Sequence, residues 1–317
     1  MRRQIVLGAL LVFGALSLTV AALQQPPAPS AAGLEVEKLT DNLYVLKALT
    51  NGGGGNTSVF ITANGVTVVD TKNPGWGQPL LEKIKTITNK PVTMIINTHT
   101  HGDHVSGNVE FPATVDVVSH ENTKANMAAM RPPSFTAPPA GGPAPNIFAA
   151  HQGHNLPKRT FKDKLTIGAG ADRIDLYYFG PAHTNGDAMV FFPSARVLHM
   201  ADVFANKGLP GMDANNGGTG IGYAATLTKA ANWADSANVE KIVNGHNAAT
   251  TTRAELREFI SYIQDFVKAV QDGKKAGKSV DETASAWKTP AKYAGYEAAP
   301  VPVRVRANVD LIYKETK

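Results

Sequence analysis

The sequence contains no cysteine among its 317 residues. This absence excludes disulfide bonds and any metal site built from thiolates. A metal in this protein would therefore be held by imidazole nitrogen and carboxylate oxygen. The nine histidines are consequently the first residues to consider in a search for a functional site.

The sequence also lacks a dense run of basic residues. Its formal net charge is +5, and the loss of Arg2 and Arg3 with an amino-terminal signal would leave +3 spread along the chain. Proteins that bind nucleic acids carry clustered Lys and Arg. We therefore expect a small-molecule substrate and no nucleic-acid partner.

Long hydrophobic runs are scarce, and the one at the start of the chain stands out. Residues Ile5 to Ala22 are apolar and follow Met1-Arg2-Arg3, a pattern typical of a secretory signal. We expect a periplasmic or secreted protein with no stable membrane insertion after cleavage. The alternative is a retained anchor, because the run is nearly long enough to span a bilayer. The predicted organisation is a signal peptide over residues 1–22, a linker over 23–33 and one folded domain over 34–317.

Three histidines and one aspartate lie within six consecutive positions, as His99, His101, Asp103 and His104. They follow the apolar run Val92 to Ile96, a predicted buried strand, and so lie where layered α/β folds usually place function. Neighbouring side chains on a tight turn diverge, so two metal ions fit better than one. Imidazole and carboxylate ligands favour zinc, with manganese or iron as alternatives.

Three later predicted strands also end close to a histidine or an aspartate. Strand 174–179 leads to His183, strand 197–200 to Asp202, and strand 241–243 to His246. Each residue is a weak signal by itself. Together with the first turn, however, these loops supply five histidines and two aspartates, which is enough for two metal ions.

Along residues 34–317 the sequence predicts a set of strands and helices that occurs twice, with no linker long enough to divide the chain into two domains. The clearest predicted helix spans 252–273, where Thr252 and Glu255 form a capping box, and a weaker periodicity predicts a closing helix around Val305 to Ile312. The four glycines at 52–55 indicate a flexible flap or a hairpin turn. The Pro- and Gly-rich segments 131–146 and 207–223 are predicted surface loops near the site.

Taken together, the motifs resemble those of the metallo-β-lactamase-fold hydrolase superfamily. They are His-x-His-x-Asp-His at 99–104, His183 followed by Thr-x-Gly-Asp, Asp202, and the Gly-His pair ending at His246. The resemblance implies an α/β fold, a four-layer αββα sandwich. Asp70 after strand 66–69 resembles a buried aspartate that braces the metal loops in that family.

The resemblance also implies roles for the seven side chains. His99, His101 and His183 would bind a first zinc ion, whereas Asp103, His104 and His246 would bind a second. Asp202 would bridge the two ions, and a hydroxide shared between them would be the nucleophile. Asp103 would in addition orient this hydroxide and pass on its proton.

The function expected from these motifs is that of an exported dinuclear zinc hydrolase acting on a lactone, ester, thioester or lactam. A true β-lactamase is the main alternative. It is weakened by Asp202, because the resemblance implies that lactamase subclasses place a cysteine there or do without a bridging carboxylate. An oxygenase with one iron and a non-catalytic metal-binding protein are further alternatives. The full set of seven ligands argues against both.

Several other polar residues suggest supporting roles. We expect His120 to be a helix cap or a surface group rather than a metal ligand, and Asp187 to brace the His183 loop. His151 and His154 are expected to be exposed, with contact to the substrate as the alternative for either. His199 is predicted either to hydrogen-bond near the metals or to pack in the core. In the predicted loop beside Asp202, Lys207 or Tyr223 is expected to bind an anionic substrate.

Overall fold

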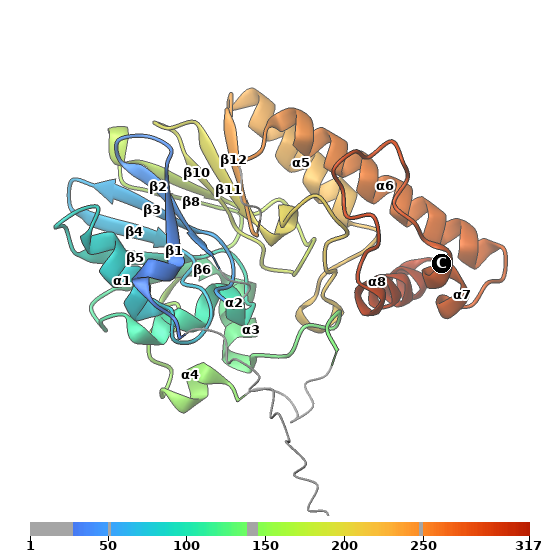
Figure 1. Cartoon of the computed structure of the whole chain (residues 1–317), viewed down its shortest axis with the longest axis horizontal. Coiled ribbons are helices and arrows are strands. Elements are labelled where there is room, and N and C mark those ends of the chain that lie inside the picture. The colour runs from blue at the N-terminus through green and yellow to red at the C-terminus, as the bar shows by residue number, and fades with distance from the viewer. Residues whose placement is uncertain (1–27, 50–51, 138–144, 247–249) are drawn as a thin grey trace, which may run out of the picture.

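The computed structural model describes residues 28–49, 52–137, 145–246 and 250–317 (Figure 1). The predicted signal peptide and the first part of the predicted linker lie outside these ranges. Ala31–Gly33, at the end of the predicted linker, forms a short 3-10 helix, and the first strand begins at Leu34. Within the described ranges, no helix combines the length and the hydropathy that crossing a membrane requires.

Seven strands form the first sheet in the order in which they occur along the chain. Strands β1 to β4 pair in antiparallel fashion, whereas β4 to β7 are parallel. Parallel neighbours need crossover connections, and these carry the helices of this half. The strands are β1 Leu34–Lys38, β2 Leu43–Ala48, β3 Thr57–Thr62, β4 Gly65–Val69, β5 Val92–Asn97, β6 Asp116–His120 and β7 Arg159–Phe161.

Five strands form the second sheet in the spatial order β12-β11-β10-β9-β8. Only β11 and β12 run parallel in this sheet, and helix α5 connects them. The strands are β8 Lys164–Ile167, β9 Ile174–Tyr177, β10 Met189–Phe192, β11 Val197–Ala201 and β12 Lys241–Asn244.

The two sheets pack face to face around a central hydrophobic core. Successive side chains of a strand point to opposite faces, and β10 shows this alternation clearly. Val190 and Phe192 belong to the core between the sheets, where the rings of Phe60 and Phe192 lie 5.0 Å apart. Met189 and Phe191 belong to the outer core, beneath the helices.

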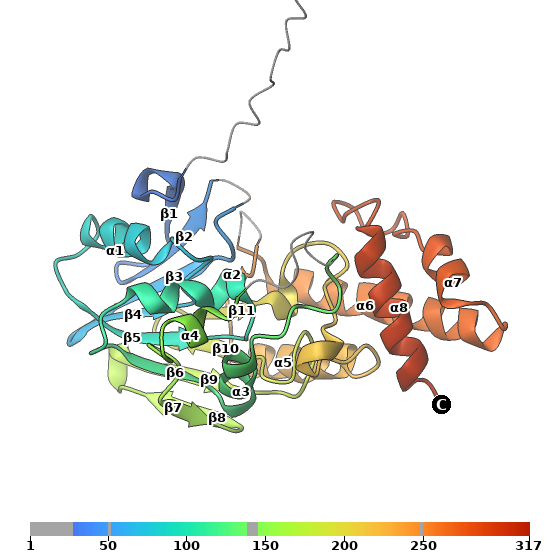
Figure 2. The same ribbon diagram turned by 90° about the horizontal axis from the view of Figure 1, so that it is seen from below.

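Helices cover the outer face of each sheet and complete the four layers (Figures 1 and 2). Leu80 and Ile84 of α1 pack on the outer face of the first sheet, and α5 and α6 pack on that of the second. The predicted αββα sandwich is therefore confirmed. The helices are α1 Gly77–Lys85, α2 Gly102–Val105, α3 Glu121–Ala129, α4 Ile147–Ala150, α5 Tyr223–Ser236, α6 Arg253–Lys275, α7 Val280–Ala286 and α8 Pro302–Glu315.

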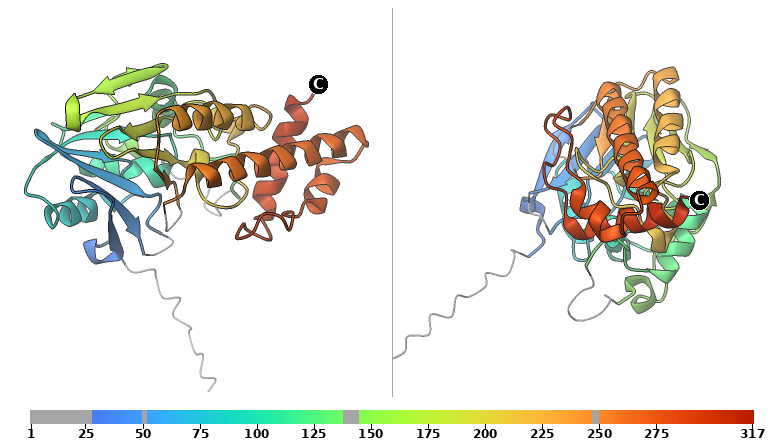
Figure 3. Two further views of the ribbon diagram at one scale, coloured as in Figure 1. Left: turned by 90° about the horizontal axis from the view of Figure 1, so that it is seen from above. Right: turned by 90° about the vertical axis from the view of Figure 1, so that its right-hand side faces the viewer.

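The carboxyl-terminal helices extend beyond the end of the two sheets (Figure 3). The predicted capping box at Thr252 and Glu255 is present at the start of α6. The predicted closing helix is also present, as α8, which packs together with α7 against α6. The sequence did not predict α7, because its seven residues are too few to establish a helical hydrophobic period.

Candidate metal centre

The four predicted ligands between residues 99 and 104 lie on the turn after β5 and on α2, as expected. Asp70, at the end of β4, stabilises this turn. Its carboxylate accepts hydrogen bonds from Thr98 N at 2.9 Å and Thr98 Oγ1 at 2.6 Å. The same carboxylate lies 2.8 Å from His104 Nδ1. The predicted bracing role of Asp70 is confirmed.

The second sheet presents the other three predicted ligands at the ends of its strands. His183 follows β9, Asp202 directly follows β11, and His246 follows β12. Ala201 has a φ of +45°, which is rare for alanine and marks local backbone strain before Asp202. A Cβ atom at Gly245 would lie 1.9 Å from Asp202 Oδ1, so only glycine leaves room for this carboxylate.

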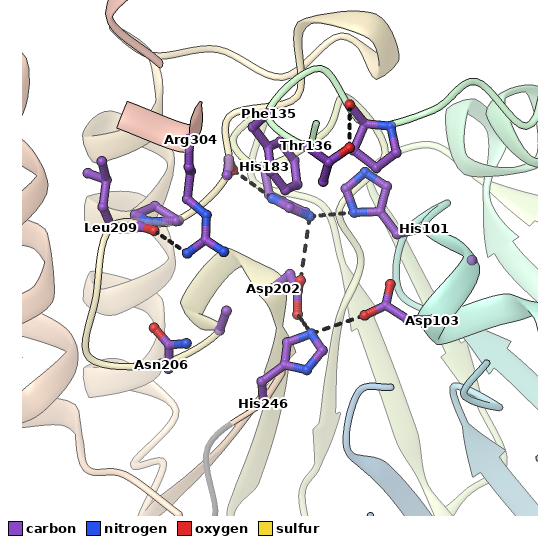
Figure 4. Close-up of a pocket in the computed structure, with 15 residues that line it drawn as sticks. His101, Asp103, Phe135, Thr136, His183, Asp202, Asn206, Leu209, His246 and Arg304 are labelled. Atoms are coloured by element: carbon purple, nitrogen blue, oxygen red, sulfur yellow. Dashed lines mark hydrogen bonds and ion pairs between the residues drawn. The ribbon is translucent and has the colours of Figure 1, made fainter. Parts of the chain in front are cut away.

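Donor atoms of His99, His101, His183 and Asp202 lie within 4.8 Å of one another. His183 Nε2 is 2.8 Å from His101 Nδ1 and 3.7 Å from Asp202 Oδ2. All four side chains are buried. They form the first of two adjoining groups of potential ligands, and Figure 4 shows three of them, His101, His183 and Asp202.

Asp103, His104 and His246 form the second group. His246 Nε2 lies 3.3 Å from both Asp103 Oδ2 and His104 Nε2. The carboxylate of Asp202 lies between the two groups, because its Oδ1 is 3.2 Å from the Nε2 atoms of both His104 and His246. Its Oδ2 faces His183 in the first group. All seven predicted ligands are therefore brought together.

An unpaired polar atom shows that these side chains suit a cation. His99 Nε2 is buried and has no hydrogen-bond partner among the described residues. A buried polar atom without a partner carries a substantial energetic penalty, which a bound metal ion would remove. Nitrogen and carboxylate donors without sulfur fit zinc and related divalent metals.

Several of these imidazoles are oriented by a hydrogen bond at the ring nitrogen that points away from the ligand groups. His183 Nδ1 lies 2.7 Å from the carbonyl oxygen of Gly211, and His101 Nε2 lies 2.8 Å from Asp213 Oδ2. Together with Asp70 at His104, these contacts fix the rings so that the remaining nitrogen faces the ligand groups. The sequence did not predict the roles of Gly211 and Asp213. No spacing links Asp213 to His101, 112 positions earlier.

The electrostatics of the site also favour bound cations. Burial lowers the pKa of His99 well below its usual range and lowers the pKa of His183 to about 4, so both rings are neutral at pH 7. Burial opposes ionisation of Asp202, but His246 and His104 hold its pKa well below the usual range. Asp202 is therefore a carboxylate. At His104 burial opposes protonation, but Asp202 and Asp103 outweigh it and raise the pKa, and Asp202 likewise raises the pKa of His246. The site thus combines two neutral imidazoles with a carboxylate that favours positive charge at the other two rings, which a metal ion would supply in place of a proton.

The glycine-rich segment forms the connection between β2 and β3, which supports the hairpin interpretation over a flap. Its glycines allow close packing: a Cβ atom at Gly55 would lie 2.1 Å from Cε1 of His104. Gly55 N donates to the carbonyl oxygen of Asp103, and Asn56 N donates to that of Gly245. The segment therefore connects the loops of Asp103 and His246.

Both ligand groups open into one cavity of about 380 Å³. Its walls include Pro133, Phe135 and Thr136 from the predicted loop 131–146, and the Phe135 ring lies 5.6 Å from those of His101 and His183. Ala205, Asn206 and residues 209–211 form another wall, and Arg304 of α8 reaches the cavity from outside the metal loops. An adjoining cavity of about 260 Å³ is lined largely by apolar and proline side chains.

The other polar residues singled out from the sequence do not belong to the two ligand groups. His120 caps α3 by accepting a hydrogen bond from Asn122 N, as predicted, and Asp187 accepts from Thr184 N in the His183 loop. His199 is buried and lies 2.8 Å from Ser58 Oγ. His151 is exposed, and neither it nor the partly buried His154 lines the cavity.

The expectation that Lys207 or Tyr223 binds an anionic substrate is wrong, because both side chains have other partners and lie outside the cavity. Lys207 forms an ion pair with Glu255 at 2.9 Å. Tyr223 is fully buried, and its hydroxyl donates to the carbonyl oxygens of Asp202 and Val203. Neither lines the cavity.

Comparison with known proteins identifies the family to which this fold and these residues belong. Residues 50–246, more than half of the chain, match the metallo-beta-lactamase superfamily, and the chain belongs to it. Most members of this superfamily are metal-dependent hydrolases. The match ends before α6, so helices α6 to α8 lie outside it.

Two curated relatives share part of this sequence. The metallo-beta-lactamase type 2 of Elizabethkingia meningoseptica is 28% identical over 178 residues, which cover 52% of this chain and 60% of that protein. The 2,4-dinitroanisole O-demethylase subunit alpha of Nocardioides sp. (strain JS1661) is 30% identical over 142 residues, 44% of this chain and 38% of that protein. The chain thus spans less than two thirds of the length of either relative.

Solved structures share the fold at lower identity. A metallo-beta-lactamase from Pontibacter korlensis superimposes with a TM-score of 0.57 at 20% identity, covering 73% of this chain and 99% of that one. The DIM-1 metallo-beta-lactamase exposed to ceftazidime gives a TM-score of 0.56 at 16% identity, covering 76% and 99%. Both likenesses establish the two-sheet architecture.

Proposed function

We propose that the protein is a dinuclear zinc hydrolase that cleaves a carboxyl derivative such as a lactone, ester, thioester or lactam. His99, His101 and His183 would hold one ion, and Asp103, His104 and His246 the other. Asp202 would bridge them. The observation that carries this proposal is the position of Asp202, whose two carboxylate oxygens face the two ligand groups above a single cavity.

When bound, two zinc ions would supply an acidified water molecule as nucleophile and would polarise the substrate carbonyl. The residues of the chain would position the reactants. Asp103 is 35% exposed at the cavity and would accept a proton from the attacking water and deliver it to the leaving group. Phe135 and the proline side chains would exclude bulk water from the apolar part of the substrate.

The metal content and one histidine substitution test this proposal. We expect close to two zinc ions per chain by elemental analysis, and we expect His101→Ala to abolish turnover while the protein stays folded. His151→Ala is the matched control, because His151 is exposed and lies outside the cavity. One iron ion per chain would instead favour an oxygenase and contradict the proposed reaction.

Hydrolysis of β-lactams is the second candidate, supported by the similarity to a metallo-beta-lactamase type 2. The presence of Asp202, rather than a cysteine, favours a lactone, ester or thioester instead. Nitrocefin, a homoserine lactone and a glutathione thioester, each assayed with and without a chelator, distinguish these substrates. Chelator-sensitive turnover of nitrocefin alone would establish the lactamase.

We further propose export to the periplasm or the exterior after cleavage of residues 1–22. The supporting observation is the charged start followed by an apolar run. Mass spectrometry of the protein recovered from the periplasmic fraction would give the mature amino terminus. An intact Met1 in the membrane fraction would indicate a retained anchor.

A further inference from the structure

Arg304 is a cationic side chain in the cavity wall that the proposed metal chemistry does not use. It belongs to α8, after the part of the chain that matches the superfamily, and it lines the same cavity as His183 and Asp202. Figure 4 shows its guanidinium on the His183 side of the cavity, opposite Asp103. Helix α8 therefore contributes directly to the site.

The guanidinium of Arg304 has few partners within the described part of the chain. Nη1 donates one hydrogen bond to the carbonyl oxygen of Leu209 at 3.1 Å, whereas Nε is buried without a partner. No carboxylate of the described residues forms an ion pair with it. In contrast, Arg306 on the same helix pairs with Asp281 at 2.6 Å. The terminal nitrogens Nη1 and Nη2 thus retain donor hydrogens that a ligand in the cavity could use.

The position of Arg304 is fixed by contacts between α8 and the cavity wall. Asn308, one turn further along α8, donates to the carbonyl oxygen of Pro210 at 2.8 Å and accepts from Met212 N at 3.1 Å. Asn308 is fully buried. Such an anchored cation needs little reorganisation on binding an anion, so the interaction loses little conformational entropy.

We propose that Arg304 binds a carboxylate group of the substrate, at the end remote from the bond that is cleaved. The proposal rests on the proposed hydrolase function and names its substrate class, a carboxyl derivative that carries a second carboxylate. The planar guanidinium matches a carboxylate with two parallel hydrogen bonds. No lysine or other arginine lines this cavity among the described residues, which suits a singly charged carboxylate better than a phosphate dianion.

A pair of esters that differ only in charge tests this assignment in the zinc-loaded full chain. One is the mono-4-nitrophenyl ester of adipic acid, and the other is its neutral terminal amide. We expect kcat/KM to be about tenfold to a hundredfold higher for the anionic ester, mainly through KM. Arg304→Gln should remove this preference, and Arg304→Lys should restore part of it.

Arg306→Gln is the matched control, since it removes a positive charge from α8 at a residue outside the cavity, and it should keep the preference. A merely structural role of Arg304, through its contact with Leu209, would lower kcat/KM for both esters alike. An equal loss for both esters in Arg304→Gln would therefore overturn the inference. The same conclusion would follow if the native protein showed no preference.

Calorimetry separates this inference from the hydrolase proposal. Adipate should bind the zinc-loaded protein more tightly than its monoamide does, and Arg304→Gln should abolish the difference. If neither ester is hydrolysed but this difference in affinity is found, the proposed reaction fails and the carboxylate site stands. Equal affinities of the native protein for adipate and the monoamide would overturn the carboxylate site.

Discussion

Asp213 shows how one buried residue orients a proposed metal ligand without belonging to the ligand groups. Its Oδ2 lies 2.8 Å from His101 Nε2, and its Oδ1 accepts hydrogen bonds from Ser134 N and Asn215 N. Burial by itself opposes ionisation, but His101 holds the pKa of Asp213 well below its usual range. Asp213 is therefore a carboxylate that keeps the proton of His101 on Nε2 and leaves Nδ1 free for a metal.

We expect Asp213→Ala to weaken zinc binding by about tenfold to a hundredfold, because His101 loses the acceptor that sets its ring and tautomer. Competition with a chromogenic chelator measures this affinity. Asp272→Ala is the control, since Asp272 is exposed on α6 and pairs only with Lys268 among the described residues. Unchanged zinc affinity in Asp213→Ala would show that the contact does not orient His101.

Lys72 is a fully buried lysine whose Nζ donates to the carbonyl oxygen of Gly55. Burial lowers its pKa to about 7, and Asp70 and Asp103 only partly oppose this shift. The unfolded chain therefore binds more protons than the folded one between about pH 7 and the ordinary lysine pKa of 10.5. It follows that this residue makes the protein less stable as the pH falls from 10.5 to 7.

Lys72→Met removes this titration while keeping much of the side-chain volume. In chelator-treated samples, we compare the Tm of the variant with the Tm of the native protein at each pH. We expect the variant's Tm minus the native Tm to be larger at pH 7 than at pH 10. Differential scanning fluorimetry at both pH values measures the difference. Lys229→Met, at an exposed position of α5, is the control, and its Tm should differ from the native Tm by the same amount at both pH values. Parallel behaviour of the two variants would refute the assigned pKa.

At the scale of elements, the connection between β2 and β3 determines how closely the two halves of the site approach. Gly55 N bonds to the Asp103 loop, and Asn56 Nδ2 donates to the carbonyl oxygen of Asn244, next to the His246 loop. The glycines therefore serve packing. A side chain at Gly55 would displace either this connection or the ring of His104.

Gly55→Ala should lower the zinc content from about two ions per chain to about one, because the displaced His104 ring belongs to the second ligand group. Gly52→Ala is the matched control in the same connection, since a Cβ atom there has no neighbour within 4 Å. Elemental analysis after gel filtration gives the stoichiometry. Two zinc ions in Gly55→Ala would mean that the site tolerates the displacement.

At the scale of the whole molecule, the proposed metal ligands come from both sheets, so a metal pair would tie the two halves of the sandwich together. The first sheet supplies the residues between 99 and 104, and the second supplies His183, Asp202 and His246. A ligand that binds only the folded state stabilises it according to its concentration. Bound metal should therefore contribute to global stability.

Removal of zinc by a chelator should lower the Tm, and added zinc should restore it. Free zinc at a thousand times Kd contributes about 4 kcal/mol, which corresponds to a shift on the order of 8 °C for a domain of this size. Calorimetry of the native protein and of His101→Ala measures the shift. An equal shift in both proteins would show that zinc acts outside the proposed site.

Much of the architecture could be predicted from local patterns in the sequence. Alternating apolar residues indicated strands, and the capping box indicated the start of α6. The histidines and aspartates that the structure brings together were recognisable because each follows a predicted strand. The short helices α4 and α7 were not predicted, because four and seven residues are too few to show a helical period of hydrophobic residues.

The sequence by itself determined the candidate ligands and most of the strands and helices, because these depend on local patterns, and its resemblance to the superfamily implied the two-sheet sandwich. Only the tertiary structure decided that Asp213 orients His101, that Gly55 and Lys72 pack beneath the site, and that Arg304 enters the cavity. These roles depend on contacts between segments far apart in the chain. Such contacts are set by the packing of the sheets and helices and leave no periodic signal in the sequence.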